Sequence, residues 1–184
     1  MCSSDLGVEK LAANARVKTV ARGQPPAGPN AGQAAFFSTD AKSFISDHAM
    51  RDEVFGASSI LVRCPDVDSM REILESLEGQ LTITLQMDEA DLPYAQKLLP
   101  VLERKAGRLL VNGFPTGVEV AHAMVHGGPF PATADGRSTS VGSYAIYRFL
   151  RPVCYQDFPA ALLPEALRDG NPAGIPRRMD GKLG

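Results

Sequence analysis

The amino-acid sequence predicts an α/β fold, and three observations support this prediction. Two segments, residues 67–77 and 88–105, show the 3.6-residue apolar spacing of amphipathic helices and alternate with three short segments typical of strands. The first strand segment, residues 58–63, is almost continuously apolar, which is typical of a strand buried on both faces. The resulting order is β-α-β-α-β, which indicates a layer of strands covered by helices.

The residues before this layer are expected to form a helix, a loop and weak strands. Residues 5–21 place apolar side chains at helical spacing behind Ser4, and Gly23 follows as a stop signal. Residues 23–32 contain three prolines and three glycines, which favour an exposed loop. The short β-prone piece at residues 34–37 completes this part of the chain.

The elements of the layer carry their own boundary signals. Asp66 is the expected N-cap of the helix at residues 67–77, and Gly79 lies just past the end of that helix. Residues 81–87 alternate strictly between apolar and polar side chains, as a half-buried strand does. The last strand, residues 109–111, runs into the turn sequence of residues 112–117, and α/β folds place binding residues at such strand exits.

The carboxyl-terminal part of the chain has a different character. Residues 118–142 are rich in Gly, Pro, Ser and Thr, and long irregular segments of this kind are usually functional or unusually well packed. Residues 144–155 alternate well enough for an aromatic strand, ended in part by Pro152. This strand has no obvious partner within the chain, so we expect it to seek another sheet.

Composition excludes several classes of partner. The chain has 184 residues with 19 basic and 21 acidic side chains, which gives a net charge of −2 and no electrostatic reason to expect nucleic acid or an anionic membrane. Its apolar runs are far shorter than the roughly 20 residues of a membrane helix. We therefore expect a cytoplasmic protein that binds neither nucleic acid nor membrane.

A metal or phosphate site is not indicated. His122 and His126 are four residues apart, but the zinc-hydrolase pattern needs Glu directly after the first His, where Ala123 stands. The glycines at positions 127 and 128 are not followed by the Lys-Ser/Thr pair of a phosphate loop. Backbone turning explains them better, and we expect no metal ligands.

The three cysteines show no sign of a nucleophile. Cys64 ends an apolar strand with Pro65 behind it, and Cys154 lies in the late aromatic segment. Reactive cysteines need surroundings that stabilise the thiolate, so both are interpreted as small hydrophobic residues. Cys2 lies at an unanchored terminus. An odd number of widely spaced cysteines also argues against a disulfide framework.

One short segment differs from the rest. In residues 51–56, Glu53 and Phe55 are two positions apart, so in an extended turn they project to the same side. Glu53 could then accept hydrogen bonds from ribose hydroxyls while Phe55 packs on a flat ring. The alternative, which the residues alone favour, is a solvated Glu and a core Phe.

These residues and the motifs behind them resemble a known family. The sequence DEVFG, followed by AGRLLVNGFPTG, HGGPFPAT and the late aromatic segment, resembles the C-terminal part of the aldehyde dehydrogenase superfamily. The details VNGFPTGVEV and STSVGSYAIYRFLRPVCYQ are most similar to its 2-oxoglutarate semialdehyde (2,5-dioxovalerate) dehydrogenase branch. The resemblance runs from about Gly7 to the end of this chain and covers the last third of the family's chain.

The resemblance implies an oxidoreductase that uses NAD or NADP to oxidise a semialdehyde to the acid. By position, Glu53 and Phe55 match the residues that bind the nicotinamide ribose and hold the nicotinamide ring. Phe114, Thr116 and Gly117 fall on the loop that lines the aldehyde tunnel. The sequence departs from the family pattern at Ala57, where a Pro is usual.

The same resemblance implies that the chain is inactive alone. The family's catalytic cysteine, general-base glutamate and Rossmann-type cofactor domain lie upstream of the matched part. We expect residues 1–6 to be a foreign or spurious start, residues 7–142 to be the C-terminal portion of the catalytic domain, and residues 143–184 to hold an oligomerisation strand and a Pro/Gly-rich tail. The complete enzyme is expected to be a homo-oligomer. Two alternatives remain: a non-catalytic interaction module pairing through the strand at residues 144–155, and a His-ligated metal hydrolase.

Overall fold

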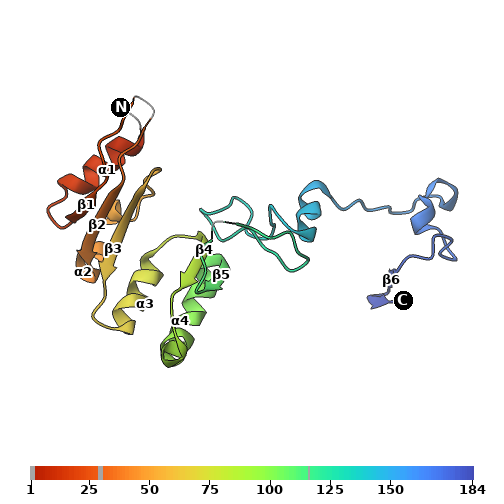
Figure 1. Ribbon diagram of the computed structural model, residues 1–184. Coiled ribbons are helices and arrows are strands. Elements are labelled where there is room, and N and C mark those ends of the chain that lie inside the picture. The colour runs from red at the N-terminus through yellow and green to blue at the C-terminus, as the bar shows by residue number, and fades with distance from the viewer. Residues whose placement is uncertain (1–2, 29–30, 116) are drawn as a thin grey trace. The chain divides into compact units, whose positions relative to one another are not determined.

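The computed structural model describes residues 3–28, 31–115 and 117–184, and the chain divides into two units after Arg148 (Figure 1). In chain order the first unit contains α1 (Ser3–Ala13), β1 (Lys18–Arg22), β2 (Ala35–Asp40), α2 (Ala41–Ser46), β3 (Ser58–Arg63), α3 (Val67–Ser76), β4 (Gln80–Leu85), α4 (Leu92–Lys105) and β5 (Ala106–Val111). Short 3-10 turns lie at His48–Met50, Glu89–Asp91 and Ser143–Phe149.

The predicted order of strands and helices from β3 to β5 is confirmed, but the described strands form separate sheets. β2 pairs in parallel with β3 and antiparallel with β1, while β4 pairs in parallel with β5. At the start of β4 the neighbouring backbone is a loop, because the Gly79 N–H donates to the Phe130 carbonyl across 3.3 Å. The expectation of a single five-element layer is therefore not met by the described strands.

The core of the three-stranded sheet lies on one face. Phe37 in β2 is fully buried, whereas its neighbour Phe36 is 38% exposed. Burial also alternates along β3, where Leu61 is 44% exposed. The prediction that residues 58–63 are buried on both faces is therefore wrong. The buried cluster joins α1, β2, α2, the 3-10 turn and α3 through Val8, Leu11, Val17, Ala35, Phe37, Ala41, Phe44, Met50 and Ile73.

The first helix is shorter than its apolar spacing predicts. It ends at Ala13, and residues 18–22 form an edge strand in which Thr19 lies opposite Phe37. The β-branched Thr19 and Val20 favour the extended conformation once β2 offers a partner. The loop predicted at residues 23–32 is confirmed, since its described residues are exposed.

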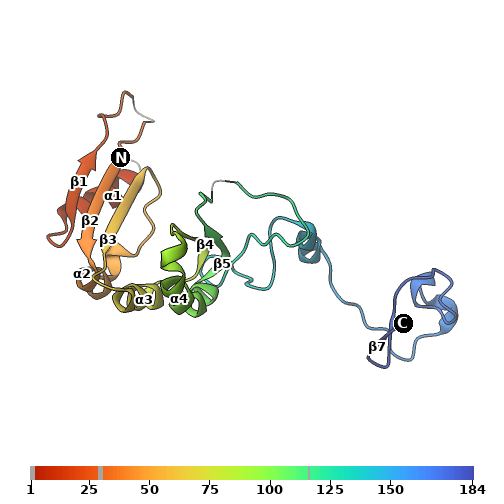
Figure 2. The same ribbon diagram turned by 60° about the horizontal axis from the view of Figure 1, so that its bottom comes forward.

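The helices of the second half are bounded as their sequences indicate. The Asp66 carboxylate accepts from the Ser69 N–H at 2.8 Å, which caps α3 and holds the pKa of Asp66 below its usual value. Asp88 and Asp91 form a capping box just before α4. α3 packs against both α2 and α4 (Figure 2).

The strand expected at residues 144–155 is not formed. Ser143–Phe149 is a 3-10 helix, and residues 150–155 have no regular structure. A strand is stable only when its backbone groups have a partner, and no described segment pairs with this one. The second unit, residues 149–184, consists of short 3-10 turns and a small hairpin of β6 (Arg178–Met179) and β7 (Lys182–Leu183).

Candidate functional site

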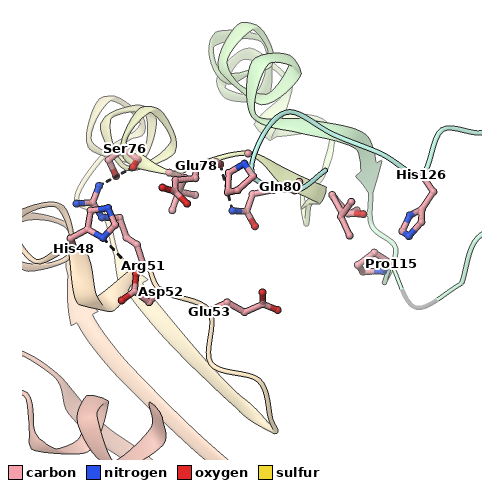
Figure 3. Close-up of a pocket in the computed structure, with 15 residues that line it drawn as sticks. His48, Arg51, Asp52, Glu53, Ser76, Glu78, Gln80, Pro115 and His126 are labelled. Carbon is pink, nitrogen blue, oxygen red and sulfur yellow. Dashed lines mark hydrogen bonds and ion pairs between the residues drawn. The ribbon is translucent and has the colours of Figure 1, made fainter. Parts of the chain in front are cut away.

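A cavity of about 760 Å³ lies in the first unit (Figure 3). Its walls come from four parts of the chain. These are the turn after α2 (residues 48–53), the end of α3 with the start of β4 (residues 76–82), the loop after β5 at residue 115, and the segment of residues 126–132. The residues that line it include His48, Arg51, Asp52, Glu53, Ser76, Glu78, Gln80, Pro115 and His126. The predicted residue Glu53 is thus part of a hollow that also receives polar groups from β4 and the later loops.

The turn that carries Glu53 is held by residues on either side of it. Met50 is only 4% exposed, and Val54 packs against the core of the three-stranded sheet. Gly56 has a φ of 152°, a backbone conformation that favours glycine, where the turn leads into β3. The exposed Glu53 therefore lies on a turn fixed at both ends.

The exposure of Phe55 decides between the two interpretations of the segment. Phe55 is 72% exposed, so it is not a core residue, while the intervening Val54 is packed inward. This alternation is that of an extended chain, in which Glu53 and Phe55 project away from the core. Phe55 is therefore a surface residue, and the interpretation of Phe55 as a core residue is wrong.

Two polar groups next to Glu53 have partners. His48 Nδ1 lies 3.6 Å from Asp52 Oδ1, and Arg51 Nη1 donates to the Ser76 carbonyl at 2.8 Å (Figure 3). Glu53 itself makes no hydrogen bond or ion pair with any other described residue, and its side chain extends into the cavity. Its carboxylate can therefore accept hydrogen bonds from a ligand.

The predicted substrate-binding residues lie on the loop after β5. Phe114 is 82% exposed, and its neighbour Pro115 lines the cavity. The carbonyl of Gly117 accepts from Arg108 Nη1 at 3.1 Å, while Thr116 lies outside the described residues. The structure thus brings this loop to the cavity through Pro115 and leaves the Phe114 ring in solvent.

Asn112 joins the two loops that leave the β4–β5 sheet. Its side chain accepts from the Met87 N–H at 2.8 Å and donates to the Met87 carbonyl at 2.7 Å. Its φ of 52° is a left-handed conformation that asparagine tolerates better than most residues. The start of the NGFPTG turn is therefore fixed to the strand exit beside it.

His126 is a cavity residue that sequence reasoning missed. The residues 119–126 form no helix, so His122 and His126 do not share a helix face, and the ring of His122 instead lies 2.9 Å from the Ser143 hydroxyl. The backbone N–H of His126 donates at 2.7 Å to Thr139 Oγ1, and Thr139 is itself 4% exposed. The only available signal was the Gly-Gly pair that follows His126.

The Gly-Gly pair permits an unusually close approach of backbones. A Cβ atom built on Gly107 in β5 would lie 2.1 Å from the Gly127 carbonyl oxygen, and one on Gly128 would lie 2.4 Å from the Gln80 carbonyl oxygen. Only glycine fits at such contacts. These glycines seat the HGGPFPAT segment directly against the starts of β4 and β5 and so place His126 at the cavity.

Neither described cysteine is among the residues that line this cavity. Cys64 is half-buried at the end of β3, where burial and the nearby Asp66 raise the pKa of its thiol. Cys154 is exposed in the second unit. A raised pKa is the opposite of what a thiolate nucleophile needs. Cys64 is therefore unsuited to attack a carbonyl.

Two further properties concern metals and membranes. Among the described residues, no three His, Cys, Asp or Glu side chains come together in a way that could hold a metal ion. A helix with the length and apolar character needed to cross a membrane is likewise not found in the described parts of the chain.

Comparisons with known proteins give consistent results. No protein-family model matches the sequence. The chain is 57% identical over 176 residues to the alpha-ketoglutaric semialdehyde dehydrogenase 2 of Azospirillum brasilense and 51% identical over 178 residues to the alpha-ketoglutaric semialdehyde dehydrogenase of Acinetobacter baylyi. Each match covers 96% of this chain but 34% of the relative, so the chain spans about a third of the length of these relatives.

Solved structures support the fold. The Delta-pyrroline-5-carboxylate dehydrogenase of Mycobacterium tuberculosis matches 88% of this chain and 31% of its own, with a TM-score of 0.62 and 15% identity. The NAD+ complex of the betaine aldehyde dehydrogenase of Staphylococcus aureus matches 81% of this chain and 27% of its own, with a TM-score of 0.58 and 16% identity. At such identities the likeness concerns the fold alone. The resemblance inferred from the motifs is confirmed: this chain is similar to about a third of an aldehyde dehydrogenase, and the relatives that it matches at 57% and 51% identity are alpha-ketoglutaric semialdehyde dehydrogenases.

Proposed function

We propose that the chain is the part of an NAD(P)-dependent semialdehyde dehydrogenase that contacts the nicotinamide end of the cofactor. The observation that carries this proposal is the pair Glu53 and Phe55, both exposed on a turn that Met50 and Val54 fix to the core. An acceptor and an aromatic ring projecting together suit a ribose with a flat base beside it. The names of the 57% and 51% identical relatives support a dehydrogenase.

Each residue has a separate role in this proposal. The Glu53 carboxylate accepts hydrogen bonds from the ribose hydroxyls, and a charged acceptor makes such bonds stronger than a neutral one does. Phe55 packs against the nicotinamide ring and limits its rotation, so that one face is presented to the aldehyde carbon. When bound, the cofactor supplies the acceptor for the hydride that the aldehyde loses.

We assign the substrate end of the site to the loop after β5. Phe114, Thr116 and Gly117 would line the passage for the aldehyde, and Pro115 connects this loop with the cavity that holds Glu53. The names of the relatives favour the semialdehyde of 2-oxoglutarate as substrate. Its carboxylate would need hydrogen-bond donors in that passage.

The chemistry needs groups that we place outside this chain. Covalent oxidation of an aldehyde requires an activated thiolate, a base and an oxyanion site in one place. Cys64 has a raised pKa, and neither Cys64 nor Cys154 lines the cavity. Because the chain spans about a third of its relatives, we propose that the nucleophile, the base and the Rossmann domain belong to the other two thirds.

We also propose that the complete enzyme is a homo-oligomer. Exposed aromatic residues are concentrated near the boundary of the two units, at Tyr144 (55% exposed), Tyr147 (63%) and Phe149 (84%). Exposed apolar groups of this kind favour association. The alternative, a module that pairs through residues 144–155, stays a prediction, since this segment has no partner strand in the described chain and starts as a 3-10 helix there.

A chimera tests the proposed function. This chain would replace the matching 176-residue segment of the Azospirillum enzyme, and the product would be assayed with 2-oxoglutarate semialdehyde and NAD or NADP. We expect turnover, and we expect Phe55→Ala to lower kcat/KM about tenfold or more through loss of cofactor orientation. The matched control is Tyr94→Ala, which removes an aromatic ring that is 51% exposed on α4. Equal kcat/KM values for the two variants would contradict the assignment of Phe55 to the cofactor.

A further inference from the structure

The carboxyl-terminal end of α3 joins three parts of the first unit. Arg51 Nη1 donates to the Ser76 carbonyl at 2.8 Å, and Lys105 Nζ donates to the Glu75 carbonyl, also at 2.8 Å. Ser76 is the last residue of α3. The last carbonyls of a helix lack partners within it and carry partial negative charge, so cations are stabilising there. Both the turn after α2 and the end of α4 are thus attached to the same helix end.

Arg51 occupies a particular place in this arrangement. It follows the buried Met50 directly and is two positions before Glu53. Its side chain is half-buried, and its Nε atom is fully enclosed without a hydrogen-bond partner among the described residues. A long cationic side chain loses considerable freedom when it is held in this way, so the bond to Ser76 must offset that cost.

We propose that Arg51 is a positioning residue for Glu53 and Phe55. By binding the Ser76 carbonyl it fixes the turn between Met50 and Val54, and so fixes the backbone from which the Glu53 side chain enters the cavity. The inference rests on the proposed function of Glu53 and Phe55. It adds that α3, which carries no residue of the proposed cofactor contact, determines how well that contact is formed.

The single bonded N–H of Arg51 predicts how substitutions behave. Arg51→Lys keeps a donor group and a positive charge at the helix end, whereas Arg51→Met keeps only an apolar stem and loses both. In the chimera we expect Arg51→Met to raise the KM for NAD about fivefold while kcat and the KM for the semialdehyde change less than about twofold. Arg51→Lys should recover at least half of the loss. Arg71→Met is the matched control, because Arg71 is on α3 and, within the part of the chain that the structure describes, forms its ion pair with Asp68 alone, at 3.9 Å.

The outcomes separate this inference from the function on which it rests. If Glu53→Gln raises the KM for NAD but Arg51→Met behaves like Arg71→Met, the positioning role is wrong and the proposed function stands. If Glu53→Gln changes nothing, the proposed function fails, and the positioning role fails with it.

Hydrogen exchange of the chain itself gives a readout that does not depend on activity. In Arg51→Met the amides of residues 50, 51 and 58, which donate to the carbonyls of Asp47, His48 and Gly56, should exchange faster, while those of β2 keep their protection. Protection lost equally in β2 would show a general structural role and overturn the proposal. Unchanged exchange at residues 50, 51 and 58 would overturn it as well.

Discussion

The side-chain amide of Asn14 donates to the Asp47 carboxylate at 2.8 Å and joins the end of α1 to the residue that opens the Glu53 turn. The other oxygen of Asp47 accepts from the Ala49 N–H at 3.1 Å and caps the 3-10 turn that contains Met50. Asn14 in turn accepts from the Arg16 N–H at 3.0 Å. The position of the proposed cofactor turn therefore depends on a contact with the first helix.

This contact makes a pH-dependent contribution to stability. The hydrogen bond from Asn14 holds the pKa of Asp47 below its usual value of 3.8. A carboxyl group with a lowered folded-state pKa stabilises the fold fully above its unfolded pKa and loses that contribution as the pH falls through the folded pKa. We expect the urea midpoint of the chain to fall on acidification below about pH 4, and to fall less in Asn14→Ala. An identical pH profile for the variant would show that Asn14 does not control the Asp47 pKa.

Gly107 is predicted to be intolerant of any side chain. In Gly107→Ala the new methyl group would lie 2.1 Å from the Gly127 carbonyl oxygen, so one of the two backbones must move. We expect a loss of about 2–3 kcal/mol or more in the free energy of unfolding, measured by urea denaturation. Gly28→Ala, at a position with no atom within 4 Å of the added Cβ, is the control. Equal midpoints for the two variants would mean that the HGGPFPAT segment does not lie against β5.

Phe114 is predicted to contribute to use of the aldehyde substrate and not to binding of the cofactor. In the chimera, Phe114→Ala should lower kcat/KM for the semialdehyde about tenfold, since the ring is exposed on the proposed substrate loop and its loss removes little packing within this chain. The KM for NAD should be unchanged, in contrast to Phe55→Ala. Steady-state kinetics with each substrate varied in turn would distinguish the two. If Phe114→Ala changed only the KM for NAD, the loop would have to be assigned to the cofactor and not to the aldehyde.

The chain by itself is predicted not to oxidise aldehydes. Burial raises the pKa of the Cys64 thiol, and Cys154 is not part of the cavity. Reduction of NAD or NADP measured at 340 nm should therefore remain at the background rate with the purified chain. Turnover abolished by Cys64→Ala or Cys154→Ala would identify a nucleophile that this account denies. Turnover that survives both changes would contradict it equally.

Much of the first unit was predictable because its signals are local. The apolar spacing of α3, the capping residues Asp66 and Asp88 and the strict alternation of β4 act within one element, and these elements form where expected. The same local spacing misleads at residues 18–22, where pairing with β2 outweighs helical propensity. It also misleads at residues 144–155, where a strand pattern lacks a partner.

The candidate site was predictable only in part, because a cavity is assembled from distant segments. The period of two around Val54 predicts that Glu53 and Phe55 both project away from the core, and only the structure shows that Phe55 is exposed and that Glu53 alone of the two lines the cavity. The contributions of Arg51 and His126 depend on contacts with Ser76 and Thr139, which lie 25 and 13 positions away. No local pattern encodes such contacts.

The dissociation constant for NAD of the Glu53→Gln chimera tests the central claim most directly. An amide cannot replace a charged acceptor to the ribose hydroxyls, so we predict affinity about tenfold weaker than that of the unsubstituted chimera, measured by calorimetry. Glu78→Gln, which removes a charge from the same cavity, should change the constant less than about twofold. An unchanged dissociation constant in Glu53→Gln, or an equal loss in both variants, would contradict the assignment of Glu53 to the cofactor.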